Sequence, residues 1–171
     1  MKQFRSLFIA SVLGLMSVSF IHAQNSKIAH IASQELIEAM PEYKAAMTEL
    51  DQLQNTYKAS IEDMMKETQS LSEKYQAEAP TKTDEVNQAR ALELQGSQTK
   101  IREFQQNAYK KLQEKEQELM KPIYEKAKNA IQKVAKAKGF DYVLDSTPGT
   151  GVLLSDGYNL MPDVKKELGI Q

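Results

Sequence analysis

The chain has 171 residues, a formal net charge of −1 and no cysteine. This length fits one ordinary domain, and the lack of cysteine excludes disulfides and thiolate metal sites. The nearly balanced charge gives no reason to expect nucleic acid as a partner. Proline and glycine are sparse in the middle of the chain, where only Pro80, Gly96 and Pro122 occur between residues 42 and 137. Long helices are therefore expected there.

Residues 1–23 have the pattern of a signal peptide. The basic start MKQFR is followed by an apolar run at residues 7–21, and Ala23 offers a small residue before a cut. A membrane anchor is the alternative, but this run is shorter than the roughly 20 residues that span a bilayer. We expect export with a cleaved leader, so that the mature chain starts near Gln24.

A short apolar segment opens the mature chain. Residues 24–34 contain KIAHIA at 27–32 and the start of SQEL at 33–36, in which Ser33 is suited to cap a helix. The pattern predicts a strand at residues 27–32 that leads directly into the first long helix.

Residues 35–121 predict a long antiparallel helical hairpin. Pro80 cannot lie inside a helix and Thr83 suits a helix start, so the tip is expected near residues 80–83. In such a pairing, the residue numbers of two facing positions add up to about 163. The arm is then on the order of 65 Å long. Gln54 and Thr68 are polar breaks in a coiled-coil spacing of three and four. The apolar residues with this spacing are Leu36, Met40, Tyr43, Met47, Leu50, Tyr57, Ile61, Met64, Leu71 and Tyr75, then Leu94, Ile101, Ala108, Leu112, Leu119, Ile123, Ala127, Ala130 and Val134.

The charges of the two predicted helices are complementary. Residues 35–85 hold 12 acidic and 5 basic side chains, whereas residues 100–138 hold 5 acidic and 11 basic ones. Exposed ion pairs contribute little stability, so we expect them to set register and orientation. The predicted neighbours are Glu62 and Asp63 with Lys100 and Arg102, and Glu42 with Lys121.

Residues 122–171 predict the root of the second helix, a β-hairpin and a closing helix. Pro122 is expected to kink the second helix and Gly139 to end it. Residues 140–145 and 151–154 have strand signals around a Pro/Gly turn, and PDVKKELGI follows as a helix. A lone hairpin is marginally stable, so it needs the strand at the start of the chain and further copies of the sheet.

The predicted fold class is mainly α with a small β body. A long coiled-coil hairpin arm is joined to short strands from both ends of the chain, and a helical bundle with a tail is the simpler alternative. Closing several copies of the sheet around an axis would remove its open edges. Symmetry alone permits dimers or trimers. The residues expected to share that oligomeric core are Ile28, Ile31, Val143, Leu144 and Leu153.

No catalytic pattern is found, and no metal or cofactor is expected. His30 lies inside the first predicted strand, where a structural imidazole is the expected role. GTGVLL lacks the third glycine and the Lys-Ser/Thr of a phosphate loop. Asp145 is explained by turn hydrogen bonding. The sequence therefore predicts a protein that is not an enzyme.

The arm offers candidate contacts for another protein chain. Met65 and Tyr109 lie off the coiled-coil spacing, and Phe104 adds an aromatic side chain of the kind that promiscuous binders use. Lys110 and Lys111 are candidates for steering, since charge accelerates encounter. A further basic group suits either an anionic lipid or lipopolysaccharide surface, or an ordinary solvated helix face. It consists of Lys126, Lys128, Lys133, Lys136 and Lys138.

In the order of its parts the sequence resembles the Skp/OmpH family of periplasmic chaperones. KIAHI leads into the charged helical hairpin, and AIQKVAKAKGFDYVLDSTPGTGVLLSDGYNL and PDVKKELGI follow. The ends carry the specific part of this resemblance, above all GFDYVLD, GVLL and YNL. The resemblance implies a periplasmic homotrimer that holds unfolded outer-membrane proteins in a cavity between three arms, without ATP. Family members are typically basic, whereas this chain is slightly acidic. A structural coiled-coil spacer of the cell envelope is the alternative function.

Overall fold

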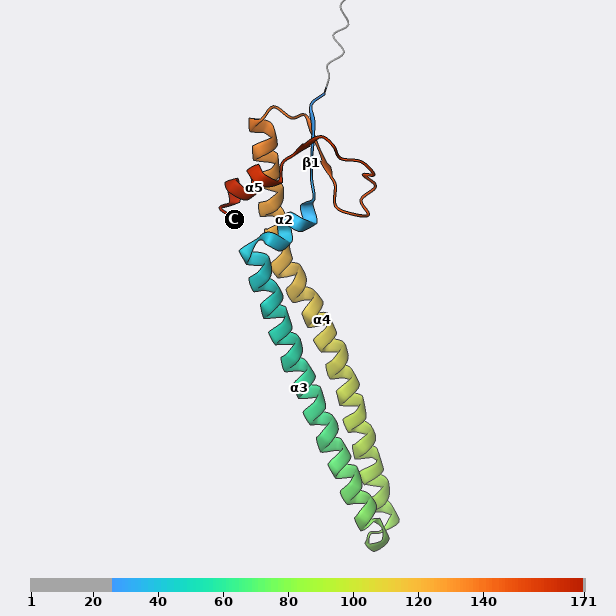
Figure 1. The fold of residues 1–171 in the computed structure, drawn as a ribbon. Coiled ribbons are helices and arrows are strands. Elements are labelled where there is room, and N and C mark those ends of the chain that lie inside the picture. Colours follow the sequence, from blue (N-terminus) through green and yellow to red (C-terminus); the bar gives the residue numbers. More distant parts are fainter. Residues whose placement is uncertain (1–25, 171) are drawn as a thin grey trace, which may run out of the picture.

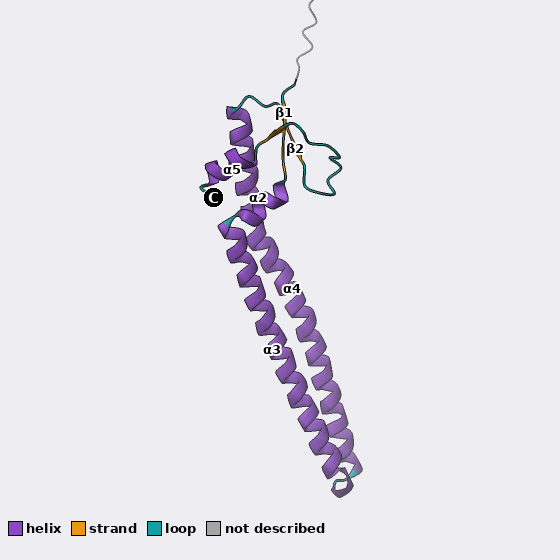
Figure 2. Ribbon diagram, in the orientation of Figure 1, coloured by secondary structure: helices purple, strands orange, loops and turns teal. Residues whose placement is uncertain are grey.

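The structure, a computed structural model, describes residues 26–170, so the predicted leader at residues 1–23 lies outside the described residues. Helices α3 and α4 form a long hairpin arm that extends from a small body (Figures 1 and 2). The predicted fold class, mainly helical with a small sheet fed by both ends of the chain, is confirmed. In chain order the elements are β1 (Ile28–Ile31), α2 (Ser33–Ala39), α3 (Pro41–Glu78), the 3-10 turn η1 (Ala79–Thr81), α4 (Asp84–Ala137), β2 (Tyr142–Asp145), β3 (Tyr158–Asn159) and α5 (Met161–Leu168).

The first long helix is divided at Met40. Met40 has extended backbone angles, φ −70° and ψ 133°, because the residue before a proline is kept out of the helical region. Pro41 then takes the first position of α3, where its missing N–H costs nothing. The helix that the sequence predicts as continuous is thus two helices, and only the second belongs to the arm.

The tip of the arm lies where the sequence predicts it. Pro80 lies in η1, which separates α3 from α4. The Thr83 side chain caps α4 by accepting a hydrogen bond from the Val86 N–H at 3.4 Å. The helix start predicted at Thr83 is therefore confirmed.

Helix α4 is longer than its partner and continues into the body. Pro122 lies inside it without ending it. The helix stops before Gly139, whose φ of 72° is left-handed. The N–H of Gly139 donates to Lys136 O at 3.1 Å and that of Phe140 donates to Ala135 O at 3.0 Å, which is the Schellman arrangement. Gly139 is confirmed as the stop signal.

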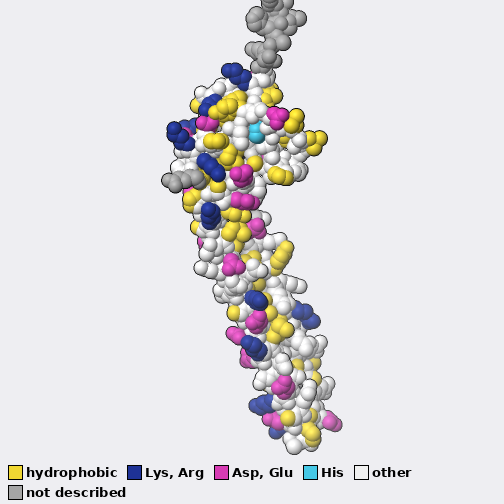
Figure 3. All heavy atoms as spheres, viewed as in Figure 1, with side chains coloured by type: hydrophobic (Ala, Val, Ile, Leu, Met, Phe, Trp, Pro, Cys, Tyr) yellow, Lys and Arg dark blue, Asp and Glu magenta, His cyan; other side chains and the backbone are white. Residues whose placement is uncertain are grey.

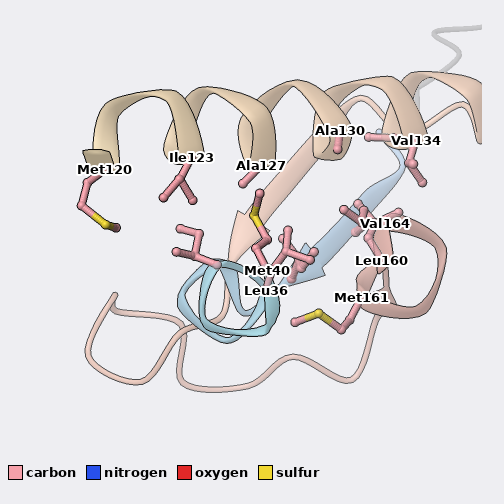
Figure 4. Close-up of a cluster of buried hydrophobic side chains, with 14 of the residues drawn as sticks. Leu36, Met40, Met120, Ile123, Ala127, Ala130, Val134, Leu160, Met161 and Val164 are labelled. Atoms are coloured by element: carbon pink, nitrogen blue, oxygen red, sulfur yellow. The ribbon is translucent and has the colours of Figure 1, made fainter. Parts of the chain in front are cut away.

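The hydrophobic core lies where the end of α4 meets α2, β1 and α5. One face of α4 points into this core with the three-and-four spacing of a buried helix face (Figure 4). That face consists of Met120, Ile123, Ala127, Ala130 and Val134. Opposite it lie Leu36, Met40, Leu160, Met161 and Val164. Within residues 26–170, no helix is both long and apolar enough to cross a membrane.

The sheet has the strand order β2-β1-β3, and both outer strands run parallel to β1. The prediction that residues more than 100 apart share one sheet is confirmed. The predicted β-hairpin is wrong, because β2 does not pair with its successor. The third strand is Tyr158–Asn159, whereas residues 151–154 belong to a loop in which Leu153 is fully exposed.

The topology explains this difference. Parallel strands cannot be joined by a tight turn, so residues 146–157 must carry the chain across the sheet to the far edge of β1. The backbone of this loop turns at Gly149 and Gly151, both at φ 92°. The apolar run that predicts a strand is therefore part of a crossing loop.

Candidate functional site

The row of side chains on each arm helix that faces the other helix forms the seam of the arm. In its middle, Tyr57 and Phe104 pack edge to face, with ring centroids 6.0 Å apart and an interplanar angle of 74°. Both rings are half-buried. Phe104, a predicted contact residue, is therefore part of the seam, where it joins α3 to α4.

A polar cluster holds the tip together. The Arg90 guanidinium lies 4.4 Å from the centre of the Tyr75 ring and 2.5 Å from the Glu78 carboxylate. Its hydrogen bond lowers the pKa of Glu78. The Tyr75 hydroxyl donates to Glu93 at 2.7 Å, which raises the pKa of that hydroxyl. These contacts fix the two helices at the end of the arm where they lack the support of the body.

Ion pairs cross the arm nearer its root. Glu49 pairs with Lys115 at 2.9 Å, and Glu42 pairs with Lys126 rather than with the predicted Lys121. The hydrogen bond from Lys126 lowers the pKa of Glu42. The predicted pairs of Glu62 and Asp63 with Lys100 and Arg102 do not form within the described chain. The complementary charges do join the helices, but only at the root and the tip.

Large apolar side chains remain exposed along the arm. Met65 is 54% exposed and Tyr109 is 65% exposed, as their positions off the spacing predict. Met47, which the sequence places in the seam, is 45% exposed instead, because the smaller Ala46 takes the buried position. Leu92 near the tip is also exposed, at 62%. It is not among the contact candidates predicted from the sequence, although it does not fit the apolar spacing around Leu94. Figure 3 shows hydrophobic side chains dispersed along one face of the arm between charged ones.

The structure does not bring the five predicted contact residues into one site. Lys110 and Lys111 are exposed on α4, and both pair with Glu114, at 3.8 Å and 2.8 Å. Phe104 is in the seam. Only Met65 and Tyr109 are exposed apolar groups that have no role in joining the helices.

The basic group at the root of the arm is partly committed to ion pairs. Lys126 pairs with Glu42, Lys133 with Glu167 at 2.6 Å, and Lys138 with Asp163 at 3.0 Å. Lys128 and Lys136 instead line a groove between β2 and α4. These pairs favour a mainly structural role for the group over a continuous anion-binding surface.

The sheet has one buried and one open face. Neighbours in the strand register share a face. Ala29 and Ile31 of β1 are buried, at 1% and 2% exposed, and Val143 pairs with Ala29 on that side. Ile31 is thus already covered within its own chain.

The open face is apolar. Ile28 pairs with Tyr142 and His30 pairs with Leu144. Ile28, Tyr142 and Leu144 are 50%, 60% and 45% exposed. His30 shares this face, and its Nδ1 is 3.0 Å from the Ser146 hydroxyl, as expected for a structural imidazole. Leu153, in the loop beyond this face, is fully exposed.

Comparison with known proteins agrees with this architecture. The family model described as outer membrane protein (OmpH-like) matches residues 27–168. The chain belongs to the OmpH-like family. A solved structure of a candidate outer membrane chaperone (OmpH-like) from Caulobacter crescentus CB15 has the same fold as this OmpH-like chain, with a TM-score of 0.75 and 17% identity over 84% of this chain and 83% of that one. A search of curated protein sequences finds no significant match.

Proposed function

We propose that this OmpH-like protein is a periplasmic holdase chaperone, which binds unfolded outer-membrane proteins between its arms without ATP. The observation that carries the proposal is the exposure of large apolar side chains, including Met65 and Tyr109, on a long arm that projects from the body. Unfolded chains aggregate through transiently exposed apolar surface and open strand edges. Dispersed apolar groups on an arm can cover such surface without ordering the bound chain. The description of the Caulobacter relative as a candidate outer membrane chaperone supports the same function.

The test is aggregation of an unfolded outer-membrane β-barrel protein that is diluted out of urea. We expect a several-fold molar excess of the mature protein to suppress light scattering, with no effect of added ATP. Bovine serum albumin at the same mass concentration is the control for crowding. Scattering that is unchanged by the protein would reject the holdase and favour the structural spacer.

We further propose that the body assembles as a homotrimer. The open face of the sheet leaves Ile28, Tyr142 and Leu144 in water, and β2 and β3 leave unpaired edges, which invite pairing with other chains. Symmetry permits several closed assemblies, and the resemblance to the Skp/OmpH family favours three copies. Such a trimer would hold three arms around a common space.

A further inference from the structure

The two sides of the arm differ in chemistry. Successive residues of an α-helix are about 100° apart, so the residues before and after a seam residue lie on opposite sides of the seam. The antiparallel helices are related by an approximate two-fold axis normal to the plane that contains both. The residues that follow seam positions therefore lie on one common face of the arm, and those that precede them lie on the other.

Helix α4 shows the difference most clearly. Its apolar seam residues are Leu94, Ile101, Phe104, Ala108, Leu112 and Leu119. The residues that follow them are Gln95, Arg102, Gln105, Tyr109, Gln113 and Met120, of which one is charged. Met120 is buried in the core of the body, and the other five are exposed. The residues that precede them are Glu93, Lys100, Glu103, Asn107, Lys111 and Glu118, of which five are charged. We call the first side the amide face and the second the ionic face.

Helix α3 adds its exposed methionines to the amide face. Met47 follows the buried Ala46, and Met65 follows the half-buried Met64. Met47 and Met65 are five full turns apart, because 18 residues make five turns of 3.6 residues, so they lie on one line along the helix. The charge of α3 is not divided in this way, because Lys44, Asp51, Lys58 and Glu62 also follow seam residues and lie on this face.

The charged side chains of the ionic face hold the hairpin together. Glu42 and Glu49 lie there, and both form ion pairs that cross to α4. No residue of the amide face forms an ion pair within residues 41–137. A groove opens on the amide face in the middle of the arm. Gln54, Gln105 and Tyr109 line it, together with the charged Asp51, Lys58 and Glu62. The exposed side chains of this face therefore take no part in the ion pairs that join the arm helices.

We propose that the amide face is the surface that contacts client chains, and that its partner is an unfolded, extended polypeptide. Glutamine amides offer both donors and acceptors to backbone N–H and C=O groups that an unfolded chain leaves unpaired. Methionine and tyrosine between them offer adaptable apolar contacts. The spacing of Met47, Met65 and Tyr109 is too wide for a second coiled-coil seam, which argues against another arm as the partner. The charges on this face have both signs, with Lys58 and Arg102 against Asp51 and Glu62, which argues against an anionic surface.

This inference rests on the proposed holdase function and specifies its binding surface. The test introduces a photo-crosslinking benzophenone amino acid at four exposed sites in the middle of the arm. Gln54 and Tyr109 lie on the amide face, and Thr56 and Asn107 are the controls at the same level on the ionic face. Each variant is mixed with an unfolded outer-membrane β-barrel protein diluted from urea and is then irradiated. We expect several-fold more client adduct from the amide-face sites.

The outcomes separate the two proposals. If the protein suppresses aggregation but crosslinks equally from both faces, the holdase stands and the amide-face proposal is wrong. Adducts between two copies of this chain at Tyr109, in place of client adducts, would make the amide face an interface between arms and also overturn it. If aggregation is not suppressed at all, both proposals fail.

A pair of substitutions provides a second measurement. Tyr109→Glu places a charge on the amide face, and Asn107→Glu places the same charge on the ionic face. Both positions are exposed, so both variants are expected to keep the helical circular dichroism of the native protein. We expect the affinity for the client to fall several-fold for Tyr109→Glu only. Equal affinities of the two variants would contradict the proposal.

Discussion

Asp145 joins two parts of the chain that are 112 residues apart. Its carboxylate accepts hydrogen bonds from the Ser33 N–H at 3.2 Å and from the Ser33 hydroxyl. It also accepts from the Thr147 N–H at 2.9 Å and hydroxyl at 2.6 Å. The sequence predicts both residues to have local roles, Ser33 as a helix cap and Asp145 in a turn. The turn bond forms, but Ser33 donates to Asp145 instead of capping α2, which has no side-chain cap.

These hydrogen bonds make the stability of the body sensitive to acid. Partial burial raises the pKa of Asp145, but the bonds from Ser33 and Thr147 outweigh it and lower the pKa from 3.8 to about 2. A carboxyl whose pKa is lower in the folded chain stabilises it above its unfolded pKa, and this contribution is lost as the pH falls from about 4 to about 2. Because the side chain is partly exposed to solvent, we expect Asp145→Asn to cost about 1 kcal/mol at pH 7.

Thermal unfolding between pH 2 and pH 7 measures this effect. The Asp145→Asn variant should lose stability at pH 7 and show a flatter pH dependence below pH 4. Asp156→Asn, which changes an exposed loop residue, is the control and should behave as the native protein does. Identical profiles for Asp145→Asn and the native protein would show that the bonds to Ser33 contribute nothing.

At the scale of the elements, Gly96 and Gly139 have opposite effects on α4. Gly96 lies inside the helix, and Gly139 follows its end. Gly139 adopts φ 72°, whereas Gly96 lies inside α4 with open space around the position of a Cβ atom. A left-handed conformation costs an alanine about 1 kcal/mol or more, whereas glycine inside a helix is about 1 kcal/mol worse than alanine. We therefore expect Gly139→Ala to destabilise the protein and Gly96→Ala to stabilise it, each by about 1 kcal/mol.

Urea unfolding followed by helical circular dichroism tests this pair at one fixed protein concentration, since assembly changes apparent stability. The two variants add the same methyl group, so a general effect of side-chain size would shift both in one direction. A common direction would mean that the backbone conformation at Gly139 does not decide where α4 ends.

The elements that the sequence predicts correctly are those specified by local signals. The two arm helices follow from periodic spacing, the tip from Pro80 and Thr83, and the end of α4 from Gly139. The third strand could not be predicted this way, because pairing with β1 depends on the path of a loop and not on the apolar character of residues 151–154. The prediction that Met47 lies in the seam is wrong for a similar reason. A new helix begins at Pro41, and the small Ala46 takes the buried position because it allows closer packing of the helices at the root.

The candidate site was predicted only in part. The exposure of Met65 and Tyr109 follows from their positions off the apolar spacing. Their common face does not, because it depends on the register between two antiparallel helices. Phe104 could not be assigned from the sequence either, since an aromatic residue suits a seam as well as a binding surface. Its packing against Tyr57 decides the matter.

For the whole molecule, the open face of the sheet is the feature that a single chain leaves unexplained. The sheet is too small to form a core on both sides, and Leu144 in the edge strand β2 is 45% exposed. If copies of the body cover this face, Leu144→Asp places a charge in a shared apolar core. An unpaired buried charge costs on the order of several kcal/mol per chain, so we expect the variant to dissociate. Leu92→Asp makes the same change on the arm, where Leu92 is 62% exposed, and should leave the assembly intact.

Sedimentation equilibrium at micromolar concentration measures the mass of each form. We expect the mature protein and Leu92→Asp to have three times the mass of the chain, and Leu144→Asp to approach the monomer mass. Isolated helical hairpins bury little apolar surface for their length, so the dissociated variant should also lose part of its helical circular dichroism. A native protein that is monomeric, or a Leu144→Asp variant with unchanged mass, would show that the open face is not the assembly surface.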